Sequence, residues 1–318
     1  ITFLVANLSS LYGSYYGFNE LDFLVDPISP LIICLLSYLI ITFFNFLFTE
    51  LERSKVRTAF SQYLAPEMVS RLAESSESLK LGGEKKTMTF LFSDIRGFTA
   101  ISESYKSNPE ELTELINKLL TVLSNEILDN EGTIDKYMGD CIMAFWNAPT
   151  DQENHTDLAL KASFDMEKAL ENFNIEFQKE KGMELKIGIG INTGECIVGN
   201  MGSEKRFDYT VLGDPVNLAS RLEGQSGTYG FQRILGQETV NTLKSESSLF
   251  ELDLIQVKGK TEPVKIYTSF DKFSLTEDKL NEFQIDHIDF LKNYRNQQWD
   301  SALTFVEKWE EQVVEFDL

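Results

Sequence analysis

Residues 87–99 read TMTFLFSDIRGFT and residues 132–146 read GTIDKYMGDCIMAFW. The first stretch predicts a strand at Thr87–Phe92, and the second predicts two strands joined by a tight turn. Helical spacing of apolar residues is found at 109–128, 154–178 and about 214–224. We predict further strands as a pair over 184–199, one ending at 210–212, and two near 250–257 and 264–269. Strands that alternate with helices but also form hairpins predict an α+β fold with helices on one face of the sheet.

The composition limits the partners of the protein. The 318 residues include 29 basic and 50 acidic side chains, which gives a net charge of −21. This balance argues against nucleic-acid binding, although it leaves room for a local basic pocket. Two histidines and three widely separated cysteines argue against a zinc cluster or a His-dependent triad. Any metal is therefore expected to be held by carboxylates, as Mg²⁺, Mn²⁺ and Ca²⁺ are.

The N-terminal part is strongly apolar. Residues 31–48 read LIICLLSYLIITFFNFLF, a run without a charged side chain. At about 1.5 Å per residue it spans roughly 27 Å, which predicts a transmembrane helix. The alternative is a buried helix of a soluble domain, but such helices usually keep a polar stripe. Residues 1–18 resemble the end of a second, truncated span, so 1–48 is predicted to be a membrane region.

The charges around 31–48 predict its orientation. Asp22 and Asp26 precede the run, whereas Arg53, Lys55 and Arg57 follow it. Because basic residues favour the cytoplasmic side, everything after residue 50 is expected in the cytoplasm, at the inner membrane.

Two helical segments flank the central part of the chain. Residues 49–83 are predicted to be a helical linker, either paired with a second copy or a plain amphipathic connector. Residues 271–318 are predicted to form a helical hairpin with a turn near 296–298. Its stretch at 294–309, YRNQQWDSALTFVEKW, resembles one tetratricopeptide unit. A single unit cannot bury its apolar face alone, so 274–318 is a candidate protein-binding segment.

Asp94 and Asp140 each lie beside an apolar strand and close to a glycine. Carboxylates in such positions can share hard cations, and two bridged cations polarise a phosphate and activate a hydroxyl. Considered one at a time, each aspartate is better explained as a turn residue.

Residues 202–224 read GSEKRFDYTVLGDPVNLASRLEG. Asn217 and Arg221 are four residues apart and share a helix face, where an amide and a guanidinium can orient a sugar and neutralise a phosphate. Lys258, in VKGKTEPVKIY, is expected in a turn between strands. The glycine-rich segment at 188–202 has no GK[ST] ending, so it is predicted to be a β-hairpin and not a phosphate loop.

Together these motifs resemble a known family. FSDIRGFT, DKYMGD, INTGECIVGNMG, DYTVLGDPVNLASRLEG and VKGK occur in the order and spacing of the class III nucleotidyl cyclases. The resemblance covers 84–270 and implies a ferredoxin-like palm with active sites between two catalytic domains. The apolar span and the GGE at 82–84 resemble membrane-anchored bacterial cyclases in signal transduction, whose CHASE-type sensor would lie upstream of this chain.

The resemblance also implies roles for individual residues. Asp94 and Asp140, helped by the carbonyl of Ile95, would hold two Mg²⁺ or Mn²⁺ ions. Asn217 would orient the ribose and Arg221 would stabilise the α-phosphate. Lys258 would bind the β- and γ-phosphates, and Lys205 or Arg206 would add a phosphate contact.

Lys136 and Thr210 would read the purine and decide the substrate. Lys136 matches the lysine of adenylate cyclases, whereas guanylate cyclases usually have Glu there. Thr210 stands where many adenylate cyclases have Asp, which resembles the class IIIb subgroup that includes bicarbonate-responsive enzymes. The expected reaction is ATP to cyclic AMP and pyrophosphate. The alternatives are a guanylate or mixed-specificity cyclase and a non-catalytic signalling scaffold.

The chain carries both the metal-binding and the purine-binding halves of such a site. Because the resemblance implies that these halves meet across an interface, a symmetric homodimer through the catalytic domain and linker is expected, with two equivalent sites.

Overall fold

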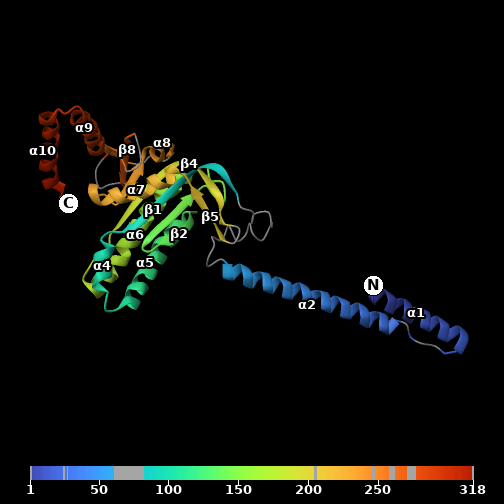
Figure 1. Cartoon of the computed structure of the whole chain (residues 1–318). Coiled ribbons are helices and arrows are strands. Elements are labelled where there is room, and N and C mark those ends of the chain that lie inside the picture. Colours follow the sequence, from blue (N-terminus) through green and yellow to red (C-terminus); the bar gives the residue numbers. More distant parts are fainter. Residues whose placement is uncertain are drawn as a thin grey trace. The chain divides into compact units, whose positions relative to one another are not determined.

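The structure is a computed structural model that describes residues 2–23, 26, 28–60, 82–203, 206–244, 248–257, 262–270 and 277–316. The chain divides into two compact units, Ile1–Ser70 and Arg71–Leu318 (Figure 1). Of the predicted linker over 49–83, residues 61–81 lie outside the described residues.

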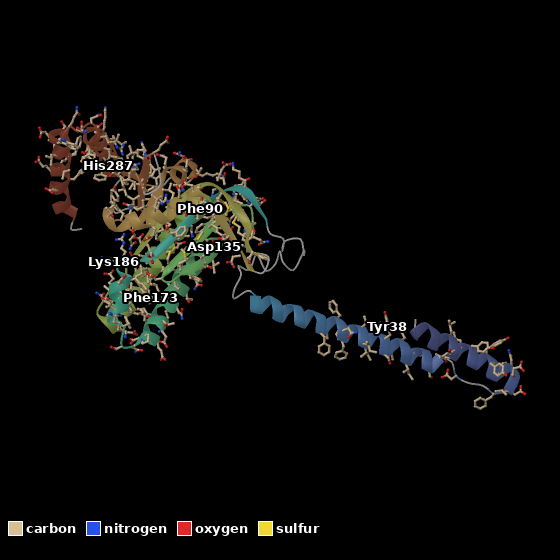
Figure 2. All side chains as sticks on the ribbon, in the orientation of Figure 1. Tyr38, Phe90, Asp135, Phe173, Lys186 and His287 are labelled. Carbon is tan, nitrogen blue, oxygen red and sulfur yellow. The ribbon has the colours of Figure 1, made fainter. Side chains whose placement is uncertain are left out.

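In the described part of the first unit the chain forms the helices α1 (Thr2–Leu21) and α2 (Ile28–Phe60). Asp26 precedes α2 and accepts hydrogen bonds from the Ile28 amide at 2.8 Å and the Ser29 hydroxyl at 2.5 Å. Many large apolar side chains of α2, including Tyr38, are exposed (Figure 2).

The prediction of membrane spans is not supported. A bilayer crossing needs about 20 residues of predominantly apolar helix. Within the described ranges, no helix has the combined length and apolarity to cross a membrane, neither over 31–48 nor over 1–18. The inner-membrane location, which no observation tests, stays a prediction.

The second unit is built on an eight-stranded sheet with the order β2-β3-β1-β4-β6-β8-β7, in which β5 pairs with β4. Among the described strands, β4 and β6 are parallel and the other pairs are antiparallel. The strands are β1 (Gly82–Ile95), β2 (Thr133–Met138), β3 (Cys141–Trp146), β4 (Ile187–Ser203), β5 (Arg206–Leu212), β6 (Arg233–Gly236), β7 (Ser248–Ile255) and β8 (Val264–Phe270). The predicted α+β class is confirmed.

Helices cover both faces of this sheet. The helices are α4 (Phe98–Ser104), α5 (Pro109–Asp129), α6 (His155–Lys181), α7 (Asp214–Tyr229) and α8 (Gln237–Thr242). Along β1, Leu91 and Ile95 pack with α5 and α6, whereas Met88, Phe90 and Phe92 pack in a second cluster with α7. The prediction of helices on one face was therefore wrong, because the period of two along β1 makes both of its faces apolar.

β4 is one long strand and not a hairpin, so the prediction of a strand pair over 184–199 was wrong. Its glycines serve the approach of α7. A Cβ on Gly190 would collide with the backbone of Ala219 and Glu223, and one on Gly194 would collide with Pro215. The antiparallel partner of its second half is β5, where Gly199 faces Thr210.

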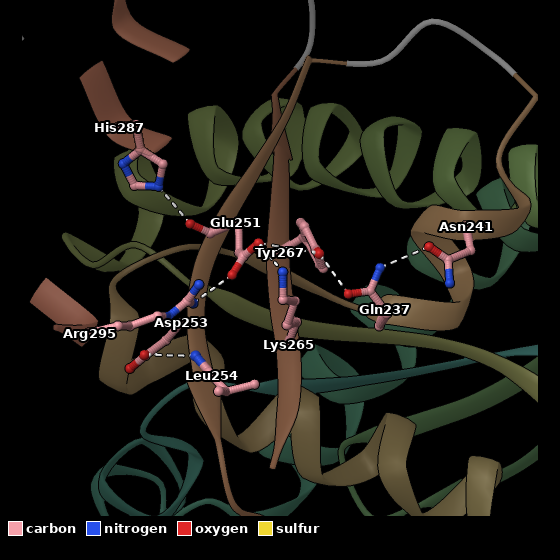
Figure 3. Close-up of polar contacts among 9 residues, drawn as sticks. All are labelled: Gln237, Asn241, Glu251, Asp253, Leu254, Lys265, Tyr267, His287 and Arg295. Atoms are coloured by element: carbon pink, nitrogen blue, oxygen red, sulfur yellow. Dashed lines mark hydrogen bonds and ion pairs between the residues drawn. The ribbon is translucent and has the colours of Figure 1, made fainter. Parts of the chain in front are cut away.

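The C-terminal helices α9 (Glu277–Arg295) and α10 (Trp299–Phe316) form the predicted helical pair. α9 packs on β7 through Phe250 and Phe283, whose ring centroids are 5.4 Å apart. The Glu251 carboxylate lies 2.9 Å from the Lys265 ammonium and 2.5 Å from the Arg295 guanidinium. His287 donates to the Glu251 carbonyl oxygen at 2.6 Å (Figure 3). The pair therefore docks part of its apolar face on the sheet, while its likeness to a tetratricopeptide unit stays a prediction.

Candidate active site

Asp94 and Asp140 converge on one backbone amide. Asp94 is next to last in β1, and Asp140 lies in the turn between β2 and β3, which is made possible by Gly139 at φ 70°. Because β3 pairs with β1, this turn lies next to the end of β1. The Ile95 amide donates to Asp94 Oδ1 at 3.1 Å and to Asp140 Oδ2 at 3.3 Å.

The Asp140 carboxyl group lies close enough to Asp94 to be affected by its charge. Burial, together with a hydrogen bond to Asp94 and its charge, raises the pKa of Asp140 to about 6. Two carboxylates at such short range favour a shared proton or a cation between them.

These residues fit a divalent cation. In the described part of the chain, no cluster of three or more His, Cys, Asp or Glu side chains is arranged to hold a metal ion. Two carboxylates and a carbonyl oxygen are nevertheless a donor set that Mg²⁺ accepts when phosphate and water complete its shell. The predicted set of Asp94, Ile95 and Asp140 has this composition.

A third acid, Glu223 of α7, belongs to the same neighbourhood. Burial raises its pKa to about 7, and the charges of Asp94 and Asp140 act in the same direction, against the opposing charge of Arg96. Arg96 itself donates to the Phe231 carbonyl oxygen at 2.5 Å, and burial lowers its pKa.

The sequence reasoning missed Glu223. The signal was the glycine at position 188, because a Cβ there would collide with Glu223 Oε1. The meaning of this glycine becomes clear only when α7 is known to pack on β4.

Asp135 contacts both Thr210 and Lys136, and so links these two side chains in space. The Thr210 hydroxyl donates to Asp135 Oδ2 at 2.6 Å, and the Lys136 ammonium lies 3.5 Å from Asp135 Oδ1. The Asp135 side chain is only 1% exposed, whereas that of Lys136 is 41% exposed. Asp135 lies in the sheet region, where Figure 2 labels it. Burial raises the pKa of Asp135, although the bond from Thr210 and the charge of Lys136 oppose this.

Asn217 and Arg221 lie on α7, as the spacing predicted. Asn217 is exposed and Arg221 is half-buried. The Arg221 Nη1 atom is buried and has no hydrogen-bond partner among the described residues. An unsatisfied buried guanidinium N–H is rare and is suited to an anionic ligand.

The other predicted phosphate contacts are not described. Lys205 and Lys258 lie outside the described residues, and Arg206 begins β5 with its side chain undescribed. Within the described residues, no hydrogen bond or ion pair joins the Asp94 and Asp140 carboxylates to Lys136, Thr210, Asn217 or Arg221.

Comparison with known proteins identifies the family of the domain that contains these residues. The family model described as the adenylate and guanylate cyclase catalytic domain matches residues 83–270. The chain belongs to this cyclase family.

Among curated relatives of this cyclase domain, an adenylate cyclase of Anabaena cylindrica is 36% identical over 67% of this chain and 43% of its own length. Adenylate cyclase 1 of Rhizobium meliloti is 32% identical over 65% of this chain and 31% of its own length. The chain thus spans less than half the length of these relatives.

The same fold is found in solved structures of an adenylyl cyclase and of a guanylyl cyclase. The adenylyl cyclase CyaB from P. aeruginosa has a TM-score of 0.56 and 36% identity, and it covers 61% of this chain and 98% of its own. The guanylyl cyclase Cya2 has a TM-score of 0.56 and 35% identity, over 62% of this chain and 98% of its own. Likeness of fold therefore does not separate the two activities, and the purine must be argued from the residues of the site.

Proposed function

We propose that the protein is an adenylate cyclase that converts ATP to 3′,5′-cyclic AMP and pyrophosphate at the interface of a homodimer. The observation that carries the cyclase chemistry is the convergence of Asp94 and Asp140 on the Ile95 amide, inside a domain of the cyclase family.

Asp94, Asp140 and the Ile95 carbonyl oxygen would hold two Mg²⁺ or Mn²⁺ ions. When bound, such ions polarise the α-phosphate and help to ionise the ribose 3′-hydroxyl.

In the proposed reaction the 3′-oxygen forms a bond to the α-phosphorus, and the bond from phosphorus to the bridging α,β-oxygen breaks. The 3′-hydroxyl proton leaves to solvent, and pyrophosphate departs with the bonding electron pair. Asn217 holds the ribose so that attack is in line. Arg221, whose Nη1 is unsatisfied, donates to the charge that grows on the α-phosphate oxygens. Lys258, with Lys205 or Arg206, would bind the pyrophosphate end.

Lys136 and Thr210 support adenine as the base. The Lys136 ammonium is a donor that matches adenine N1, which is an acceptor, and the Thr210 oxygen can accept from the exocyclic amine. In guanine, N1 carries a proton and the exocyclic position is a carbonyl, so both contacts are mismatched.

A homodimer is supported by the separation of the two halves of the site. In the cyclase family, catalytic sites are expected between two domains, and this chain supplies both the carboxylate half and the purine half. A twofold dimer then makes two equivalent sites.

The test is to measure cyclic AMP formed from ATP and cyclic GMP formed from GTP, with Mn²⁺, for the full chain and for Asp94→Ala. We expect preferential turnover of ATP and its near-complete loss in the variant. Asp289→Ala, which removes an exposed carboxylate of α9, is the matched control and should keep full activity. No cyclic nucleotide from either substrate would refute the cyclase proposal, and a preference for GTP would refute the adenylate assignment.

A further inference from the structure

Thr210 alone does not explain a preference for adenine. A hydroxyl can donate or accept, so a free threonine could accept from the adenine amine or donate to the guanine carbonyl equally well. A side chain that reads only adenine must have its proton committed elsewhere.

The contact with Asp135 uses the hydroxyl proton of Thr210 in a hydrogen bond. An ionised carboxylate can only accept, so at 2.6 Å the Thr210 hydroxyl must be the donor and Asp135 Oδ2 the acceptor. The remaining lone pairs of the Thr210 oxygen are then available only as acceptors. The carboxylate acceptor also makes this bond stronger than one between neutral groups.

The backbone explains why Asp135 can reach Thr210 while its neighbour Lys136 faces the same place. The pairing of β2 with β3 shifts register between Ile134 and Lys136, so Asp135 is the extra residue of a β-bulge. In a regular strand, adjacent side chains point to opposite faces, whereas a bulge re-aims them.

The burial of Asp135 shows that it serves this contact and not solvent. Its side chain is 1% exposed, its Oδ1 has no hydrogen-bond partner among the described residues, and the Lys136 ammonium lies 3.5 Å from that Oδ1. A buried carboxylate is costly unless it is bonded or paired. Asp135 therefore contacts both the Thr210 hydroxyl and the Lys136 ammonium, the two groups that are expected to meet the purine edge.

The geometry points to Asp135 as a specificity-determining positioning residue that holds Thr210 as an acceptor and thereby favours ATP over GTP. This inference rests on the proposed cyclase function. With guanine, the carbonyl oxygen would face the lone pairs of Thr210 and the N1 proton would face the Lys136 ammonium. Rejection by two unpaired polar contacts is stronger than rejection by shape.

The experiment measures the ratio of kcat/KM for ATP to kcat/KM for GTP with Mn²⁺ in the full chain. Asp135→Ala and Thr210→Val should each lower this ratio on the order of tenfold or more. Thr210→Ser, which keeps the hydroxyl, should preserve the ratio. Asp208→Asn, which alters a nearby exposed carboxylate, is the matched control and should leave it unchanged.

The double variant decides whether Asp135 acts through Thr210. Because the hydroxyl is absent in Thr210→Val, adding Asp135→Ala should not lower the ratio further. An equal drop in both backgrounds, or an unchanged ratio in Asp135→Ala alone, would overturn the inference. If Asp135→Ala does not fold, as judged by circular dichroism, Asp135→Leu fills the buried volume without an acceptor and is subject to the same criteria.

Failure of the inference is distinguishable from failure of the proposed function. A wild-type chain that makes cyclic AMP while Asp135 variants keep its preference refutes only the role of Asp135. A wild-type chain without turnover of either nucleotide refutes the proposed function itself.

Discussion

The acidic residues near the end of β1 repel one another, and a bound cation would reduce this repulsion. Asp94 and Asp140 share the Ile95 amide, and both of their charges help to raise the pKa of a third carboxyl group, Glu223. Arg96 offsets only part of this charge, since its own guanidinium is partly buried and is bonded to the Phe231 carbonyl. A cation bound by Asp94 and Asp140, as proposed above, would offset part of this repulsion.

This cost predicts a pH dependence of stability without metal. The pKa of Asp140 is raised to about 6 and that of Glu223 to about 7. Since ordinary carboxyl groups titrate near pH 4, the folded state binds these protons more tightly than the unfolded state. The free energy of unfolding should therefore fall as pH rises from about 4 to about 7.

The measurement is the melting temperature in a chelator between pH 4.5 and pH 8, roughly spanning that window. Asp140→Asn should flatten the fall, and Mg²⁺ added at pH 8 should raise the melting temperature of the wild-type chain. An identical pH profile in Asp140→Asn would contradict the prediction.

At the scale of elements, the fit between β4 and α7 depends on glycine. Gly190 lies where the backbone of α7 passes over the strand, so a methyl group there has no room. Other glycines of α7 itself face open space, and Gly227 has nothing within 4 Å of where its Cβ would lie.

These two glycines give a matched pair of substitutions. Gly190→Ala should lower the free energy of unfolding by about 1–3 kcal/mol, because it overpacks the contact with α7. Gly227→Ala should be neutral or raise it by up to about 1 kcal/mol, since alanine favours helix. Urea unfolding of both variants is the measurement, and equal effects would contradict the role of Gly190.

The C-terminal pair is attached to the sheet by aromatic packing as well as by Glu251. Phe283 lies between Phe250 of β7 and Trp309 of α10, at 5.4 and 5.2 Å between centroids. On the same helix, Ile285 is 63% exposed. Substitutions at Phe283 and at Ile285 therefore distinguish the docking of α9 on the sheet from the intrinsic stability of the helix.

We expect Phe283→Ala to release the pair from the sheet, at a cost of about 2 kcal/mol for a half-buried aromatic side chain. Amide hydrogen exchange in α9 should accelerate in this variant and should stay unchanged in Ile285→Ala. Unchanged protection of α9 in Phe283→Ala would show that the Glu251 contacts suffice.

At the scale of the whole molecule, the residues proposed for the two halves of the site belong to one chain, and the described contacts do not join them. The carboxylates belong to β1 and the β2–β3 turn, whereas Thr210 and Arg221 belong to β5 and α7. If the sites form between two copies, one intact half from each copy is enough for one site.

Mixing defective chains tests this arrangement. Arg221→Ala alone should lower kcat on the order of 10²–10³, and Asp94→Ala should be inactive. Equal amounts of the two, refolded or coexpressed together, should recover about a quarter of wild-type activity, because about half of the dimers carry one intact site. Asp94→Ala mixed with Asp140→Ala should recover nothing, since both defects lie in the same half. No recovery in the first mixture would contradict the shared site.

Local patterns were sufficient for the long elements. The helix predicted over 109–128 is α5, where Asn108 caps the Glu111 amide, and the helix predicted over 154–178 is α6. The short elements α4, β6 and α8 were not predicted, because so few residues carry no clear period. The aspartates were found because each stands out at the end of an apolar run.

The sequence by itself determined the cyclase family, the α+β class, the helical C-terminal pair and the residues proposed for chemistry. Only the tertiary structure decided that β4 is continuous, that α7 covers the second face of the sheet, and that Glu223 and Asp135 lie beside the residues proposed for the site. The reason is physical. The first group depends on the spacing of residues along a few turns or strands, whereas the second depends on contacts such as Thr210 with Asp135, which exist only once distant segments have packed.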